Sequence, residues 1–193
     1  MIKRYLISIP IILIFALISC KNNSEPKEVS KPQISTQSFH DAALDGNIET
    51  VKLALEGGIQ SDIIDADGKN ALMFAAFNGH SDIIKLLFEK GVPINKQDND
   101  GRTALMYAST GPFPATVKIL LDNKAETNIT DNVEHFTALM FAASEGQFEL
   151  VKLLIEYGAD PTLKDIDGDT AEDFAQQNNH KEVAQYISNY KNN

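Results

Sequence analysis

The pattern of apolar residues is clearest in the middle of the chain, where it predicts a pair of short helices. Residues 71–76 are apolar and rich in alanine, so that one side of the segment is small enough for close stacking. After a tight link at residues 78–80, apolar side chains stand at i, i+1, i+3 and i+4 across residues 83–87, which is the spacing of one helix face. An extended segment follows at residues 92–95.

This helix pair returns along the chain at a nearly constant spacing. The hexapeptide at residues 71–76 recurs with small changes at 104–109 and 138–143, and degraded copies lie near residue 40 and from Ala171. Such a period predicts a solenoid, in which each unit buries its apolar face against the next. We therefore expect an all-α domain over residues 36–193. Its five helix-turn-helix units, joined by β-hairpin-like turns, lie at about residues 36–64, 65–97, 98–130, 131–164 and 165–190.

The second helix of each unit has a predictable end. Gly58, Gly91 and Gly158 stand at equivalent positions, where a glycine in the left-handed conformation commonly ends a helix. Lys124 occupies that position in the third unit. We expect it to adopt the same left-handed backbone at a cost of roughly 1 kcal/mol relative to glycine.

A tight turn opens most of these units. The letters Asp-x-Asp-Gly occur at residues 65–68, 98–101 and 165–168, where glycine adopts a positive φ at no steric cost. The same letters suggest a calcium loop of the EF-hand type. Such a loop needs acidic ligands at its first and twelfth positions, but apolar, basic or aromatic residues stand there in this chain. We therefore interpret the motif as a turn.

The lettering of the units resembles the ankyrin repeat over about residues 36–190. The family pattern D-x-x-G-x-T-P-L-H-x-A-A-x-x-G-H is matched in the second unit by Asp65, Gly68, Leu72, Ala75, Ala76, Gly79 and His80. The family's first-helix histidine is replaced by methionine in the three central units, at Met73, Met106 and Met140. We therefore expect the histidine hydrogen bonds between repeats to be absent, with His40 alone able to keep that role.

The two terminal units are more polar than the central ones. Glu172, Asp173 and Gln176 stand where the central units carry apolar residues, and His40 and Asp41 do so in the first unit. A terminal repeat has no outer neighbour, so its outer face must be polar. The pattern therefore predicts a finished stack with a cap at each end.

The first twenty residues read as a secretory signal. Lys3 and Arg4 precede an apolar run at residues 6–18, which is too short to span a bilayer. The run ends at Cys20, and its last letters resemble the lipobox of bacterial lipoproteins. This resemblance implies removal of residues 1–19 and acylation of Cys20 at its thiol and new amino group, whereas an ordinary signal peptide with a chance cysteine is the alternative. Residues 20–35 are mainly polar, so we expect a flexible tether there.

The chain is acidic, which bears on its partners. Its 193 residues carry 17 lysine and arginine side chains against 27 aspartate and glutamate side chains, a net charge of −10. From residue 35 onward the counts are 12 and 25, and Arg102 is the only arginine there. This balance argues against nucleic-acid binding and favours a basic protein as the partner. We expect a monomer that meets the membrane through its lipid anchor only.

No constellation of residues indicates catalysis, a cofactor or a bound metal. The four histidines lie far apart in the sequence, which leaves no close metal pair, and the chain has no glycine-rich phosphate loop. Aromatic residues recur in register with the three methionines, at Phe74, Tyr107, Phe141 and Phe174. A cofactor groove is the alternative, but we interpret both rows as a ladder of core residues. We therefore predict a non-enzymatic protein without cofactor or small-molecule substrate.

Candidate partner-binding residues follow from position in the repeat. The resemblance implies binding at the turn tips and on the exposed face of the first helices. The tip candidates are Asp67, Lys69, Asn99, Asp100, Arg102, Asp167 and Asp169, and the first-helix candidates are Phe77, Asn78, Thr110, Ser144 and Glu145. The fourth tip has one extra residue and lacks the glycine, and it presents Val133, Glu134, His135 and Phe136. It fits either a tolerated insertion or a specificity loop, and we expect Phe77 and Phe136 to be exposed.

Three functions fit these features. The first is a lipid-tethered scaffold that holds a protein of the bacterial cell envelope. The second is an immunity or inhibitor protein for a secreted toxin, and the third is an accessory to a peroxide-detoxifying envelope enzyme. Lys21 follows the cysteine in place of the aspartate that retains lipoproteins in the inner membrane, which favours the outer membrane and periplasm.

Overall fold

The computed structural model describes residues 34–191. The described residues belong to one compact unit. The predicted signal peptide, the lipobox at Cys20 and most of the predicted tether lie outside the described residues. Within residues 34–191, no helix is both long and apolar enough to cross a membrane.

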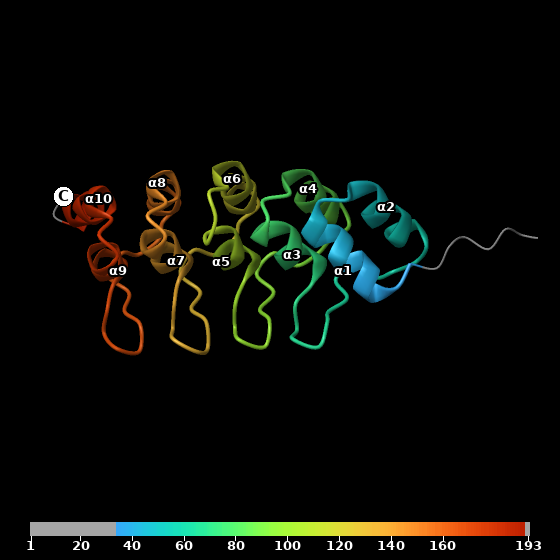
Figure 1. The fold of residues 1–193 in the computed structure, drawn as a ribbon, viewed down its shortest axis with the longest axis horizontal. Coiled ribbons are helices and arrows are strands. Elements are labelled where there is room, and N and C mark those ends of the chain that lie inside the picture. Colours follow the sequence, from blue (N-terminus) through green and yellow to red (C-terminus); the bar gives the residue numbers. More distant parts are fainter. Residues whose placement is uncertain (1–33, 192–193) are drawn as a thin grey trace, which may run out of the picture. The chain divides into compact units, whose positions relative to one another are not determined.

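Each repeat contributes two helices, which lie in two layers (Figure 1). The first-helix layer contains α1 (Thr36–Asp45), α3 (Ala71–Phe77), α5 (Ala104–Ala108), α7 (Ala138–Ser144) and α9 (Ala171–Gln177). The second-helix layer contains α2 (Ile48–Glu56), α4 (Ser81–Glu89), α6 (Pro114–Asp122), α8 (Phe148–Glu156) and α10 (Lys181–Lys191). Hairpins that join the repeats project beyond the first-helix layer. Over the described residues, the arrangement confirms the predicted all-α solenoid of five helix pairs.

A polar side chain starts every first helix. Asn70, Thr103 and Thr137 stand before α3, α5 and α7, and each accepts a hydrogen bond from the backbone N–H three residues ahead. Ser35 and Thr170 do the same for α1 and α9. These caps satisfy backbone donors that have no partner within the helix. They also fix where each helix begins relative to the hairpin before it.

The core lies between the two layers, at the positions that the repeat pattern predicts. The three ladder methionines are at most 2% exposed, which confirms the methionine half of the predicted core ladder. The aromatic half differs, because Phe74, Tyr107, Phe141 and Phe174 are only half-buried and pack against the edge of the core. A helix turns by about 100° per residue. The side chain that follows each buried methionine is therefore rotated towards the edge of the layer.

The prediction that histidine bonds between repeats are missing is wrong. His80 Nε2 lies 2.9 Å from the carbonyl oxygen of Leu44, and His180 Nε2 lies 3.0 Å from that of Ser144, each in the preceding repeat. Both rings stand where a Cβ on the preceding repeat's link glycine would clash, so glycine is required there. These histidines belong to the link between helices, a position distinct from that of the missing first-helix histidine. His40 Nε2 lies 3.0 Å from the Ile63 carbonyl oxygen, so the bond of His40 joins the first helix to the end of its own repeat and does not reach the next one.

The predicted helix ends are confirmed. Gly58, Gly91 and Gly158 have φ values of 97°, 79° and 89°. Lys124, at the equivalent position, has a φ of 71°, whereas its neighbour Asn123 has a φ of −89°. The third repeat therefore places a residue with a Cβ in a backbone conformation that favours glycine.

Candidate interaction surface

In each Asp-x-Asp-Gly hairpin, the first aspartate of the motif closes the turn. Asp65 Oδ1 accepts hydrogen bonds from the backbone N–H groups of Asp67 and Lys69, and the Asp65 N–H donates to the carbonyl oxygen of Lys69. Asp98 and Asp165 make the same bonds in their own hairpins. The Asp-x-Asp-Gly motif is therefore a turn motif, as predicted, because its first carboxylate is occupied by the backbone of its own loop.

Neighbouring hairpins are joined at their tips by single backbone hydrogen bonds. The Asn99 N–H donates to the carbonyl oxygen of Asp67 at 2.9 Å, and the Asn132 N–H donates to that of Asp100 at 2.7 Å. The Ile166 N–H donates to the carbonyl oxygen of Glu134 at 3.1 Å. The tips of the four hairpins thus form one connected row, called here the tip row. Such a row presents its side chains at fixed spacing before any partner binds, which lowers the entropy lost on association.

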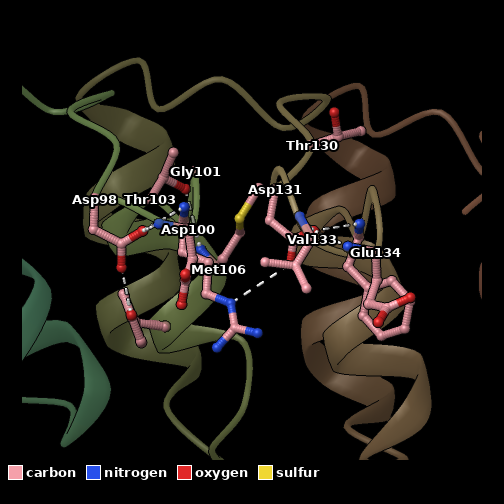
Figure 2. Close-up of polar contacts among 12 residues, drawn as sticks. Asp98, Asp100, Gly101, Thr103, Met106, Thr130, Asp131, Val133 and Glu134 are labelled. Atoms are coloured by element: carbon pink, nitrogen blue, oxygen red, sulfur yellow. Dashed lines mark hydrogen bonds and ion pairs between the residues drawn. The ribbon is translucent and has the colours of Figure 1, made fainter. Parts of the chain in front are cut away.

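The hairpin of the fourth repeat, at residues 126–137, accommodates its extra residue around a buried carboxylate (Figure 2). The Asp131 side chain is fully buried, and its Oδ1 accepts from the N–H groups of Val133, Glu134 and Phe136. Its Oδ2 lies 3.5 Å from Nε of Arg102, the only arginine of the described residues. The hairpin therefore has a defined shape of its own, in which Val133 is 49% exposed.

Phe136 is not the exposed side chain that was expected. It is half-buried, and its ring centroid lies 5.4 Å from that of Phe141 and 4.8 Å from that of Phe174, both in edge contact. The extra residue of this loop places the aromatic ring between two first helices. Phe136 therefore joins the fourth repeat to the fifth, whereas Phe77 is 46% exposed, as expected.

Several other candidates use their polar groups in hydrogen bonds within the stack of repeats. Asn78 and Asn99 each donate a side-chain hydrogen bond to a backbone carbonyl of the preceding repeat, at 2.8 and 3.0 Å. Ser144 Oγ accepts from the side chain of Asn178, and Thr110 Oγ1 donates to its own helix. These four side chains contribute first to packing between or within repeats.

The remaining candidates lie open to solvent or at its edge. Asp67, Asp100, His135, Glu145 and Asp167 are exposed. Lys69, Arg102, Glu134 and Asp169 are half-buried, and Lys69 Nζ lies 3.3 Å from a carboxylate oxygen of Asp67. The exposed carboxylates therefore dominate the tip row.

The negative charge is concentrated on the hairpins. Residues 60–70, 93–103, 126–137 and 160–170 together carry 12 acidic and 4 basic side chains. The second helices of the described repeats carry 8 acidic and 6 basic side chains, which is close to balance. Of the net charge of −13 from residue 35 onward, −8 thus lies on the hairpins. Summed charges on one face attract a basic partner and speed its association.

A small apolar hollow opens beside the tip row. It has a volume of about 240 Å³ and is lined by Leu44, Lys69, Met73, Phe74, Phe77 and Tyr107, and it is called here the Phe77 pocket. The Tyr107 hydroxyl donates to Asp98 Oδ2 at 2.6 Å. Burial, helped by this bond, raises the pKa of Tyr107, so that the phenol stays protonated and can donate to Asp98.

Phe77 and Lys69 were predicted from the sequence as interaction candidates, whereas the other four residues that line this pocket were missed. Leu44 occupies the same position as Phe77 in the preceding repeat, and this was the available signal. Met73, Phe74 and Tyr107 come from the aromatic and methionine rows that were assigned to the core. Among residues 34–191, no three histidine, cysteine, aspartate or glutamate side chains gather closely enough to hold a metal ion.

Two comparisons with known proteins match this architecture. A family model described as ankyrin repeats (3 copies) matches residues 39–131 and 111–193, most of the chain. Over 51 residues the chain is 43% identical to the human Espin-like protein, a stretch that spans 26% of this chain and 5% of that protein. The likeness to this relative therefore concerns a short part of each protein.

Proposed function

Because the chain belongs to the ankyrin-repeat family, whose repeats mediate binding to other proteins, we propose that it is a non-enzymatic scaffold for a basic protein of the bacterial cell envelope. One observation carries the choice of a basic partner. The hairpins hold 12 acidic against 4 basic side chains, while the opposite layer is nearly balanced. Backbone bonds between the tips join the four hairpins into one row.

The proposed place of action rests on the sequence of the first twenty residues. Lys3 and Arg4, the apolar run and the single cysteine of the chain together support a lipid anchor at Cys20. A tether of residues 20–35 spans roughly 20 Å on average, which is enough to hold the repeats clear of a lipid surface. The outer membrane and periplasm are favoured by Lys21.

The anchor is tested by replacing the cysteine. We expect Cys20→Ala to abolish incorporation of labelled palmitate and to leave the chain unprocessed or soluble. Ser24→Ala, a change of similar size in the same polar stretch, is the matched control and is expected to remain lipidated. Palmitate incorporation by the Cys20→Ala protein would overturn the anchor.

The scaffold role is tested in intact envelopes. The full chain is cross-linked in place, purified and analysed by mass spectrometry, alongside a variant in which Asp67, Asp100 and Asp167 are changed to asparagine. We expect a basic envelope protein that the wild type captures and the charge-neutralised variant loses. The identity of that protein, whether a toxin or an envelope enzyme, separates inhibition from an accessory role. Equal capture by both chains would refute binding through the acidic tips.

A further inference from the structure

The Phe77 pocket is apolar, whereas the surface around it is polar. One of its walls is formed at a single repeat position, which holds Leu44 in the first repeat and Phe77 in the second. The third, fourth and fifth repeats carry the polar residues Thr110, Ser144 and Gln177 there. The apolar hollow is thus confined to the first three repeats. A phenylalanine that is 46% exposed at its mouth is apolar surface of the kind that marks interaction sites.

The walls of the pocket are held in place by contacts behind them. The Phe74 ring packs against the buried ring of His40, with centroids 5.3 Å apart. Phe77 meets the ring of Tyr107 edge-on at 6.2 Å, and the Tyr107 hydroxyl is bound to Asp98. The pocket is therefore formed before a partner arrives, which is the arrangement that gives anchor residues their large share of binding energy.

The size of the pocket limits what it can hold. Its volume of about 240 Å³ lies below the roughly 300–1,000 Å³ typical of small-molecule sites. Five of its six lining residues have apolar side chains, if the hydroxyl of Tyr107 is set aside. That hydroxyl already donates a hydrogen bond to Asp98. One large apolar side chain fits this space and chemistry.

The rim of the pocket is acidic. Asp41 is exposed and lies one turn before Leu44 on α1, on the same helix face. The Asp67 side chain is 70% exposed and lies 3.3 Å from Lys69, the only basic group that lines the pocket. The Asp41 carboxylate accepts a hydrogen bond from Gln37 and forms no ion pair within residues 34–191, whereas Asp67 already attracts Lys69. The negative tip row continues beyond this rim.

We infer that the Phe77 pocket receives one aromatic or large aliphatic side chain from a partner segment in which lysine or arginine residues flank that side chain. This inference rests on the proposed function and specifies the chemistry of the partner. The apolar anchor fills the hollow between α1, α3 and α5. The flanking cations lie over Asp41 and Asp67.

The chain contains no tryptophan, so a tryptophan-bearing peptide reports its own binding without background. The probe is a pentapeptide of lysines around a central tryptophan, titrated with the full chain while indole emission and anisotropy are followed. We expect a blue-shifted emission at saturation. We expect a Kd at least about tenfold weaker for the same peptide with glutamates in place of lysines.

Variants of the pocket and a matched control locate the site. Phe77→Ala is expected to weaken the lysine peptide at least about tenfold, and Phe77→Leu, which keeps an apolar wall, to stay within about threefold of wild type. Leu53→Ala removes an apolar side chain that is 54% exposed on α2, in the other layer, and should leave the Kd unchanged. Asp67→Asn should weaken binding and flatten its dependence on salt.

Three results would overturn the inference. The first is equal affinity of the Phe77→Ala chain, and the second is equal affinity for the glutamate peptide. The third is a dimer in sedimentation that Phe77→Ala dissociates, because a second copy would then occupy the pocket. Circular dichroism of each variant separates loss of binding from loss of fold. If the peptides fail while the envelope partner is still captured through the acidic tips, the pocket assignment falls and the scaffold role stands. If the peptides bind as expected but no envelope partner is captured, the scaffold role falls and the pocket assignment stands.

Discussion

Replacing Lys124 with glycine should stabilise the protein, although it removes a side chain and adds no contact. Lys124 has a φ of 71°, at the position where three other repeats have glycine with φ values of 79° to 97°. Its side chain is exposed and forms no ion pair within the described residues. The bonds that end α6 come from the backbone, including Lys124 N–H to the Leu121 carbonyl oxygen at 2.9 Å. They are available to glycine as well.

The magnitude follows from two opposing effects. A residue with a Cβ in the left-handed region is destabilised by about 1–2 kcal/mol, and glycine relieves this strain. Glycine also makes the unfolded chain more flexible, which offsets about 0.4–1 kcal/mol of the gain. The two ranges together give a rise in the free energy of unfolding of about 0.8 kcal/mol at their midpoints and at most about 1.6 kcal/mol. For a domain of this size, 1 kcal/mol corresponds to about 2–4 °C in Tm.

The reverse change at an equivalent site is the matched control. A Cβ added at Gly91 would meet no atom within 4 Å, so Gly91→Ala introduces backbone strain without a steric clash. Urea unfolding followed by circular dichroism should show a higher midpoint for Lys124→Gly and a lower midpoint for Gly91→Ala. A lower midpoint for Lys124→Gly, or a higher one for Gly91→Ala, would refute the assignment of strain to this position.

Three further changes test the fourth and fifth repeats. Phe136→Ala should lower the free energy of unfolding by about 1–3 kcal/mol because Phe136 packs on two rings, whereas Val133→Ala at the same exposed tip should leave the Tm within error. Asp131→Ala should lower it by about 2–4 kcal/mol in urea unfolding, since three backbone N–H groups and Arg102 lose their acceptor; an unchanged midpoint would contradict the geometry. Hydrogen bonds from Thr170 hold the pKa of Asp173 below its ordinary value of 3.8. The Asp173 carboxylate therefore stabilises the fold above pH 3.8, and this stabilisation is lost as the pH falls through the lowered pKa. Asp173→Asn should therefore be less stable than wild type at neutral pH and lose less stability on acidification, and parallel pH curves would refute this.

The sequence alone determined the repeat, its helices and the punctuation between them. The regular period places equivalent side chains in register, and the helical spacing across residues 83–87 shows which face must be buried. The left-handed residue at Lys124 and the carboxylate-closed turn at Asp65 were predictable for a related reason. Each depends on the conformational preferences of a few consecutive residues, so no distant contact is needed to establish it.

Only the tertiary structure decided how side chains of different repeats meet. The buried position of Phe136, the bond from His80 to the preceding repeat and the walls of the Phe77 pocket each join residues of neighbouring repeats or residues across a loop of unusual length. The sequence does show that an aromatic residue follows each central methionine. Whether that neighbour is buried depends on how far the helix is rotated against the next repeat. That rotation is set by the packing of all contacts of the helix together, so the pocket was not predictable. The acidic row beside it was predictable because each of its turns depends on a few consecutive residues.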